Sequence, residues 1–451
     1  MRLVSSILIL ILVGFVFCLR SIDKDALRAI AGDDPSKVAY FWHITDPHVD
    51  LEYKVGSRAI CEDVVCCRSS DGNYTADQTA GKYGFIKDGE SNCDIPLATF
   101  KTGLDFIKSY PVKPEFVFYG GDTPCHVDWD YSEEYNLKYM NTIHDSMRDI
   151  LGKEMIVLSA IGNHDAAPVD QFDAGPKYSW YTEPFAAQMS FWLPLDVAES
   201  ITIAGHYNYL VRPGFRALVL NTQYADVLNF YNYKNSSESD PGALIRTTSL
   251  WLKQAEAANE RVVILAHIPP QATDPWNFAL IALCKRYSKT IIGQLYGHTH
   301  HDQFHVARDS EGAYSVAYTS PSMTTWSNQH PSVRLFKMDK TTFELLDHVT
   351  FYGNVTEANI KGNMTYRMEY SAKEAYGLSD MSPQSWERVG LDFLNNGTAI
   401  NNYIKYANAF GDADSPKTCG GKVTKECIKE LYCDVLNFSK EGFDKCKRDK
   451  Q

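Results

Sequence analysis

The sequence predicts an α/β fold, and two patterns along the chain support this prediction. Strongly apolar runs of strand length alternate with stretches of helical length between residues 38 and 300. Several of these runs end abruptly in polar residues, as buried strands do when they deliver side chains to one edge of a sheet. Strands that alternate with helices are typical of α/β proteins.

The first expected strand covers residues 38–44 and runs into Thr45-Asp46-Pro47-His48. Four further apolar runs are followed in the same way by polar residues: 116–119 by Gly120-Gly121-Asp122, 155–160 by Gly162-Asn163-His164-Asp165, 262–266 by His267, and 291–296 by Gly297-His298-Thr299-His300. Helices are expected between them, at residues 97–107, 135–151 and 250–258. We expect the polar residues to meet at the carboxyl ends of the strands.

The chain changes character near residue 314. Short strands follow one another from there to about residue 351, and beyond Gly353 the sequence turns polar and helical. We therefore divide the chain into a signal peptide (residues 1–22), a main domain (23–352) and a small helical extension (353–451). A cluster of cysteines is expected to tie this extension together.

Export from the cell is predicted by the first residues. Met1-Arg2 is followed by an apolar run from about residue 7 to 19, which has the layout of a signal peptide and is short for a membrane span. An uncleaved membrane anchor is the alternative. Six glycosylation sequons agree with export: Asn73, Asn235, Asn354, Asn363, Asn396 and Asn437. The secreted and lysosomal compartments both fit these features.

The cysteines also fit export. Of the 11 cysteines, eight form two clusters, which indicates disulfides: Cys61, Cys66, Cys67 and Cys93, then Cys419, Cys427, Cys433 and Cys446. A zinc site in the first cluster is the alternative, although adjacent cysteines suit separate bridges better than one tetrahedral site. Cys125 and Cys284 stand apart, and are either buried thiols or bridged to each other.

The polar strand ends together form an ordered set suited to a two-metal hydrolase. Such an enzyme needs a carboxylate to bridge two ions, imidazoles and an amide oxygen to complete each shell, and an open position for water and phosphate. Each piece alone is weak, because Gly-Asp is usually a turn and Gly-Asn-His-Asp could cap a helix. Five pieces in this order, each after an apolar strand, are a strong signal.

These pieces resemble the calcineurin-like metallophosphoesterases, and further details resemble the acid sphingomyelinase-like phosphodiesterases. The details are Gly120-Gly121-Asp122-Thr123-Pro124-Cys125-His126, Ala266-His267-Ile268-Pro269-Pro270, Gly297-His298-Thr299-His300 with Asp302 and Phe304, and Ser320-Pro321-Ser322. The resemblance implies a four-layer α/β/β/α sandwich of two mixed sheets, with residues 23–352 as the catalytic domain. It also implies disulfides that join Cys61 to Cys66, Cys67 to Cys93, Cys419 to Cys427 and Cys433 to Cys446.

The resemblance further implies two Zn²⁺ ions and a role for each residue around them. One zinc would be held by Asp46, His48 and His300, the other by Asn163, His267 and His298, with Asp122 as the bridge. His126 and His164 would lie near the scissile phosphate as catalytic residues, to stabilise the transition state or protonate the leaving alcohol. A histidine is protonated when the pH lies below its pKa, which is ordinarily about 6.5. Because these roles need protonated histidines, an acidic pH optimum is expected.

At two points the sequence differs from known members of the superfamily, and these differences limit which subfamily it resembles. Purple acid phosphatases carry a Tyr where this chain has Cys125, and Asp-x-Gly where it has Asp46-x-His48, so an iron pair is disfavoured. Acid sphingomyelinase carries a saposin domain before its catalytic block, whereas only about twenty residues separate the predicted signal peptide from Val38 here. The predicted function is therefore zinc-dependent hydrolysis of nucleotides or phosphocholine-type substrates. The alternatives are a true sphingomyelin phosphodiesterase and a catalytically silent binding protein.

The remaining features limit partners and site. A net charge of −12 disfavours binding to a nucleic-acid polymer, so the expected partner is a small phosphoester or a sphingolipid. We expect a monomer, with at most peripheral membrane contact. His206 and His305 are expected at the surface or behind the ligands. The segment 323–326, before His330, either borders the substrate cleft or is an ordinary packed loop.

Overall fold

The protein is described here by a computed structural model. It covers residues 23–69, 75–87, 92–173, 175–234, 239–270, 274–326, 328–395, 397–410, 419 and 423–449. The predicted signal peptide and the sequons at Asn73, Asn235 and Asn396 lie outside these residues. Among the helices of the described part, none combines the length and apolar character needed to cross a membrane.

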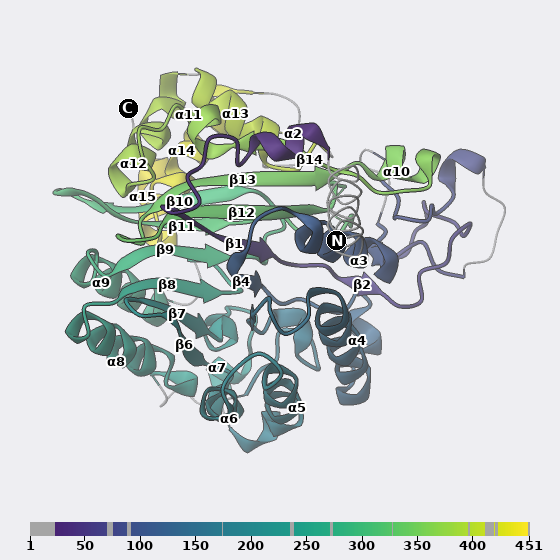
Figure 1. Cartoon of the computed structure of the whole chain (residues 1–451), viewed down its shortest axis with the longest axis horizontal. Helices are drawn as coiled ribbons and strands as arrows, with labels where there is room; N and C mark the ends of the chain where they lie inside the picture. Colours follow the sequence, from purple (N-terminus) through teal and green to yellow (C-terminus); the bar gives the residue numbers. More distant parts are fainter. Residues whose placement is uncertain are drawn as a thin grey trace, which may run out of the picture.

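Two six-stranded mixed sheets form the centre of the fold (Figure 1). The strands of the first sheet, in spatial order, are β14 (Tyr366–Ser371), β13 (Leu345–Gly353), β12 (Ser332–Asp339), β1 (Val38–Ile44), β4 (Pro114–Tyr119) and β5 (Val157–Ser159). Those of the second are β10 (Gln303–Asp309), β11 (Gly312–Thr319), β9 (Ile291–Tyr296), β8 (Arg261–Ala266), β7 (Phe215–Leu220) and β6 (Tyr207–Arg212). A further pair joins β2 (Val49–Asp50) to β3 (Ile95–Pro96).

The strands that precede the predicted ligands each run parallel to at least one neighbour, and all of them except the edge strand β5 lie inside a sheet. In the first sheet β1 pairs in parallel with β4, and β4 with β5. In the second, β7, β8, β9 and β11 form a continuous parallel set. Parallel neighbours end at the same edge of a sheet, so the polar residues after β1, β4, β5, β8 and β9 are brought to one side of the molecule.

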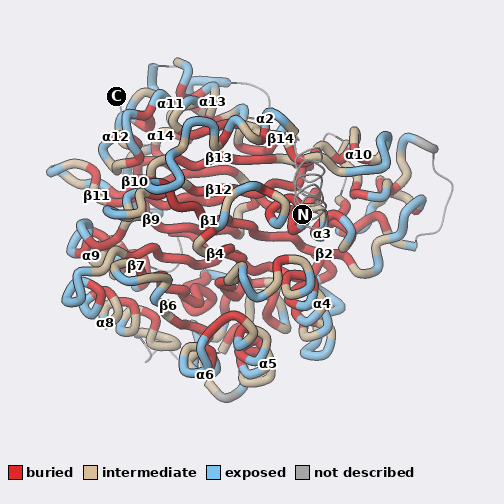
Figure 2. The backbone as a smooth tube through the Cα atoms, viewed as in Figure 1, coloured by how far each residue is buried: buried red, intermediate tan, exposed pale blue. Residues whose placement is uncertain are grey.

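The two sheets pack face to face, and alternate residues of β1 show why this strand is mostly apolar. Phe41 lies on the inner face, where Phe116 of the same sheet reaches Phe215 of the second sheet at 6.4 Å between ring centroids. Trp42 points the other way and contacts Phe106 of α3. Every residue of β1 is buried, because the second sheet covers one face of the strand and helices cover the other (Figure 2).

Helices complete the outer layers. The first sheet is covered by α3 and α4, and α8 and α9 pack on the second sheet. The helices before residue 300 are α2 (Lys24–Arg28), α3 (Leu97–Ser109), α4 (Glu133–Leu151), α5 (Ser179–Met189), α6 (Leu195–Ala204), α7 (Tyr231–Lys234), α8 (Leu244–Ala257) and α9 (Asp274–Arg286). The predicted α/β class and its four-layer sandwich are confirmed.

The C-terminal region is helical but shares the sandwich. Its helices are α10 (Val355–Lys361), α11 (Ala372–Tyr376), α12 (Pro383–Asp392), α13 (Thr398–Tyr406), α14 (Lys425–Val435) and α15 (Lys440–Arg448). Unlike the expectation from sequence, it also contributes a strand, β14, which pairs with β13. Helix α12 packs on β10 and β11, and α14 packs on β10. The predicted boundary at residue 352 therefore falls within a shared sheet, and the division into domains stays a prediction.

The disulfides of the structure have the pairing that the resemblance implies. They join Cys61 to Cys66, Cys67 to Cys93, Cys419 to Cys427 and Cys433 to Cys446. The alternative of a zinc site in the first cluster is therefore wrong. Cys125 and Cys284 are free and buried, so a bridge between them is also excluded.

Candidate metal centre

All seven predicted ligands lie just beyond strand ends and meet at one edge of the sandwich. Five of them have a left-handed backbone, with φ between 39° and 72°: Asp46, His48, Asp122, His298 and His300. Non-glycine residues seldom adopt this conformation, and such residues cluster at functional sites. The tight turns that follow the strands direct these side chains toward a common point.

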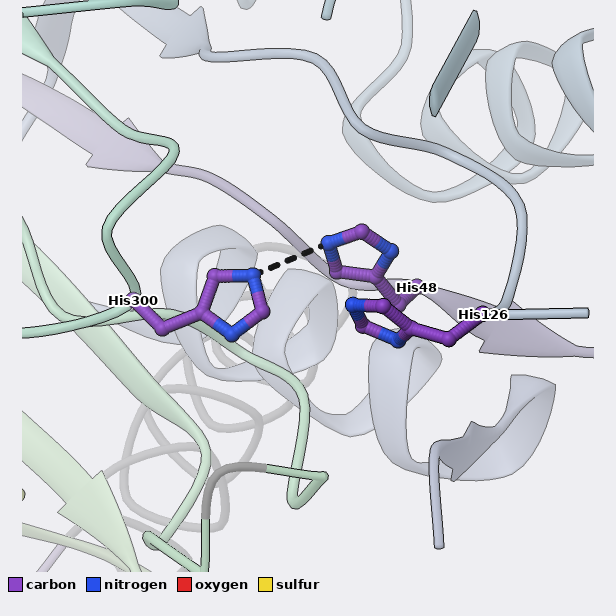
Figure 3. Close-up of side chains that lie close together, drawn as sticks. All are labelled: His48, His126 and His300. Atoms are coloured by element: carbon purple, nitrogen blue, oxygen red, sulfur yellow. Dashed lines mark hydrogen bonds between the residues drawn. The ribbon is translucent and has the colours of Figure 1, made fainter. Parts of the chain in front are cut away.

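The first group of ligands is His48, His300, Asp46 and Asp122, all of them buried. His48 Nε2 lies 3.1 Å from His300 Nε2 and 3.4 Å from Asp122 Oδ2. Asp46 Oδ1 lies 3.8 Å from His300 Nε2. Figure 3 shows His48 and His300 with their Nε2 atoms turned toward each other.

The second group lies on the other side of Asp122. His267 Nε2 is 3.0 Å from Asp122 Oδ2 and 2.9 Å from Asn163 Oδ1. His298 Nδ1 is 2.8 Å from the same amide oxygen. Asp122 Oδ2 thus faces both groups, which is the position of a bridging carboxylate.

The hydrogen bonds around the ligands fit a metal centre. His48 Nδ1 donates to the carbonyl of Pro124 at 2.9 Å, and His267 Nδ1 donates to that of Gly120 at 2.7 Å. Metal-binding histidines are held in this way, because a donor bond from one ring nitrogen leaves the other facing the ion. The side-chain Nδ2 of Asn163 donates a hydrogen bond to Asp170 Oδ1 at 2.9 Å. This bond leaves the Oδ1 atom of Asn163 turned toward the centre. The nitrogen and oxygen atoms present therefore suit divalent cations.

Burial sets the protonation of several ligands. It lowers the pKa of His48 to about 4 and that of His298 to about 3, helped by neighbouring histidines. Both imidazoles are then neutral above pH 5, the form in which histidine binds a metal. His267 differs, because burial is outweighed by the carboxylates of Asp122 and Asp46, which raise its pKa to about 10. A cation at this position would replace the proton of His267.

His126 lies directly beside the first group. Its ring stacks on His48 at 3.9 Å and on Trp326 at 4.2 Å between centroids. Its Nδ1 lies 2.9 Å from Asp94 Oδ1. Burial, together with the nearby His164, lowers the pKa of His126 well below its usual value.

His164 lies opposite His126, with 4.8 Å between the two ring centroids. Its Nδ1 is 3.0 Å from the hydroxyl of Tyr131 and 3.3 Å from Asp128 Oδ1. Burial alone would lower its pKa, but Asp122 and Asp128 raise it to about 9. Burial thus lowers the pKa of His126, whereas neighbouring carboxylates raise that of His164, so the two histidines of one site differ in basicity.

Glycines let the loops approach closely enough to form the centre. A Cβ at Gly297 would collide with the side chains of Thr45 and Asp46, and one at Gly162 would collide with Asp122. Gly121 has a φ of 89° and would meet the backbone of Gly162. Any side chain at these positions would separate the strand ends.

The structure also shows where the segment 323–326 and the histidines outside the ligand set lie. The segment 323–326 borders the site, because Trp326 covers His126. His206 and His305 are buried rather than at the surface: His206 accepts a hydrogen bond from the backbone of Asn221, and His305 faces Asp434.

The sequence argument missed several residues around the ligands: Asp94, Asp128, Tyr131 and Asp170. Only Asp128 carried a signal, since it stands two residues after His126, the same spacing as Asp46 and His48. Asp170 lies in the loop after a predicted ligand, but nothing in its surroundings distinguishes it from other loop carboxylates.

Comparison with known proteins bears on these features. The sequence model of the calcineurin-like phosphoesterases matches residues 39–302, a segment that contains every predicted ligand. The chain belongs to this family. The acid sphingomyelin phosphodiesterase C-terminal region matches residues 313–451. This phosphoesterase is therefore of the acid sphingomyelinase-like type, a phosphoric diester hydrolase, and the His and Asp groups described above could hold divalent metal ions.

Individual relatives agree with this assignment. Sphingomyelin phosphodiesterase A of Dictyostelium discoideum is 31% identical over 93% of this chain and 70% of its own length. Sphingomyelin phosphodiesterase of Homo sapiens is 32% identical over 77% of this chain and 56% of its own length. The cyclic GMP-AMP phosphodiesterase SMPDL3A of Mus musculus is 29% identical over 92% of this chain and 93% of its own length.

Proposed function

We propose that this phosphoesterase binds two Zn²⁺ ions and hydrolyses phosphodiester or phosphoanhydride bonds. Asp46, His48 and His300 would hold one ion, Asn163, His267 and His298 the other, and Asp122 both. The observation that carries this proposal is the convergence of carboxylate, imidazole and amide ligands on the two sides of Asp122 Oδ2. Histidine-rich sites with carboxylate ligands suit zinc.

Zinc, when bound, would lower the pKa of a water molecule and polarise the phosphoryl oxygens. The chain itself contributes His126 and His164, whose rings lie in a T-shaped contact with 4.8 Å between their centroids. His164, charged and held by Asp128, would stabilise negative charge on the phosphoryl group. His126, fixed between two rings, would face the leaving alcohol and hold a proton for it.

For the substrate we propose nucleotides or phosphocholine-type esters. Support comes from the mouse relative, which is named for cyclic GMP-AMP and matches this chain over nearly its whole length. Sphingomyelin is the second candidate. It is favoured by six enzymes named sphingomyelin phosphodiesterases, which are 29 to 33% identical to this chain and of which it spans 56 to 70%. A silent scaffold is disfavoured because every predicted ligand reaches the centre.

We also propose that the protein is exported, is a monomer and works in an acidic compartment or outside the cell. The four disulfides support an oxidising environment. Among the described sequons, Asn363 is exposed, while Asn354 and Asn437 are half-buried.

The proposal is tested by assaying the purified, zinc-loaded protein at pH 5 and pH 7.5 with ATP, CDP-choline and micellar sphingomyelin. Turnover of the soluble substrates with little sphingomyelin cleavage, faster at pH 5, is the expected result. Dominant cleavage of sphingomyelin would select the second candidate. A His164→Ala variant serves as the control, and equal activity in this variant would reject the site.

A further inference from the structure

The buried carboxylate of Asp94, which belongs to neither group of ligands, forms hydrogen bonds with His126. Asp94 is fully buried, and it follows Cys93 just before strand β3. His126 Nδ1 lies 2.9 Å from Asp94 Oδ1 and 3.0 Å from Oδ2, and the backbone N–H of His126 donates to Oδ2 at 2.8 Å. One carboxylate thus fixes both the backbone and the ring of the same residue.

The two faces of the His126 ring are covered as well. His48 and Trp326 stack on it at 3.9 and 4.2 Å, with interplanar angles of 25° and 14°. Two rings that both lie this close and nearly parallel must occupy opposite faces. Figure 3 shows the ring of His126 beside that of His48, with its far edge turned toward His300. Since Nδ1 is engaged by Asp94, the ring atom that faces the centre is Nε2.

Asp94 is itself held by the loop that contains Trp326. The hydroxyl of Thr324 donates to Asp94 Oδ1 at 2.7 Å, and the backbone N–H of Trp326 donates to that hydroxyl at 3.1 Å. The carboxylate therefore accepts three hydrogen bonds and cannot turn away from His126. Trp326, Thr324 and Asp94 form one connected support for the ring.

The backbone N–H of His164 also donates to a buried carboxylate, Asp122 Oδ1, at 2.8 Å, but its ring is held differently. Asp128 is 42% exposed and lies 3.3 Å from His164 Nδ1, a position that it shares with the hydroxyl of Tyr131. Asp94, by contrast, is out of contact with solvent. A carboxylate that accepts an N–H at Nδ1 fixes the tautomer of an imidazole and presents Nε2 to the reacting group.

We infer that Asp94 is a positioning residue, which holds His126 so that Nε2 faces the oxygen of the leaving group. This inference rests on the proposed phosphodiesterase function. In the reaction, the bond between phosphorus and the leaving oxygen breaks as the oxygen of water bonds to phosphorus. Because Nδ1 already donates to Asp94, His126 first takes up a proton from solvent at Nε2. As the bond breaks, this proton passes to the leaving oxygen, the ring returns to its neutral form, and the attacking water releases one proton to solvent. Asp94 gains and loses no proton in this sequence.

The test measures how strongly the rate depends on the leaving group. Aryl esters of phosphocholine and of thymidine 5′-phosphate are compared for wild type and Asp94→Asn, with leaving groups from 4-nitrophenol to the less acidic 4-methoxyphenol. We expect kcat for the 4-methoxyphenyl ester to fall about 10²-fold or more, and kcat for the 4-nitrophenyl ester to fall less than about tenfold. An acidic phenol leaves without help, so it needs little from His126. An equal loss on all esters would overturn the inference.

Two further measurements separate the alternatives. Bound zinc per chain should be unchanged in Asp94→Asn, and loss of zinc would instead make Asp94 a support of the metal centre and reject the inference. Asp50→Asn is the matched control, because Asp50 is equally buried but pairs with Arg68 at 2.8 Å. It should lower stability and leave the leaving-group dependence of wild type intact. If wild type cleaves no ester, the proposed function itself fails.

Discussion

Asp170 lies outside the predicted ligand set but decides how Asn163 presents its side chain. Because Asp170 Oδ1 accepts the Nδ2 hydrogen of Asn163, the amide oxygen is left to face the centre. We predict that Asp170→Ala weakens zinc binding about 10- to 100-fold, the usual effect of removing a partner of a metal ligand. Zinc titration of the metal-free protein measures this change.

Asp173 provides the control for this variant. It lies in the same loop, but its partner is Lys177 at 3.7 Å and it touches none of the ligands. Asp173→Ala should leave the zinc affinity within about twofold of wild type. An equal loss in both variants would show that the loop, and not the orientation of Asn163, controls binding.

Asp226 gives a prediction for pH. Burial raises its pKa from 3.8 to about 6, and its Oδ2 is buried without a hydrogen-bond partner. The folded state therefore binds this proton more tightly than the unfolded state, so stability falls as pH rises from about 4 to 6. We predict that Asp226→Asn raises the free energy of unfolding by about 2 kcal/mol at pH 7.5 and by close to zero at pH 4. Thermal unfolding at both pH values checks this, and an equal effect at both would refute it.

At the scale of elements, the turn after β9 depends on Gly297. A Cβ at this position would collide with Thr45 and with Asp46, a predicted ligand. We predict that Gly297→Ala costs about 1 to 3 kcal/mol of stability and lowers activity and bound zinc together, because the two strand ends must move apart. Activity and zinc content of the purified variant are the readouts.

Gly397→Ala is the matched substitution. A Cβ at Gly397, before α13, would meet its nearest neighbour, Asp392, only at an ordinary contact distance of 3.5 Å. This variant should keep both activity and zinc at wild-type levels. Normal zinc content in Gly297→Ala would contradict the argument from close packing.

The elements differ in how well the sequence predicts them. The strands β1 and β9 were predicted with their observed bounds, and β4 and β8 within two residues, because they are largely buried and mostly apolar. The strand β7 was not predicted, although it is largely buried and lies inside the second sheet. β10, β6 and β14 were not predicted either. β6 and β14 are only partly buried edge strands, and β10, also at an edge, has a mixed polar sequence; none of them shows the continuous apolar run of a central strand.

The candidate site likewise contains residues that the sequence predicts and residues that it does not. Its predicted ligands follow apolar strands directly, so their order along the chain carried the signal. Asp94 was not recognised as part of it, since its contact to His126 joins residues 32 positions apart in the chain. For the segment with Trp326, the sequence left open whether it borders the cleft, and its contact to His126 spans 200 positions. Only the packing of the loops brings these residues together.

For the molecule as a whole, the C-terminal region stabilises the sheet that carries His298 and His300. Trp386 of α12 is buried against Phe304 of β10, with 4.5 Å between ring centroids, and against Tyr318 of β11. We predict that Trp386→Ala lowers the free energy of unfolding by about 3 to 5 kcal/mol, as for other buried aromatic residues. Calorimetry should still show one transition, because β14 belongs to the first sheet. Separate transitions for the two regions would contradict this account.

The central claim is that the chain cleaves phosphate esters with two metal ions held around Asp122. The most direct measurement is the zinc content of the purified protein, followed by hydrolysis of ATP and CDP-choline before and after removal of the metal and its return. The account predicts two zinc ions per chain, no turnover without them, and recovery when zinc is restored. Full turnover by the metal-free protein would contradict it.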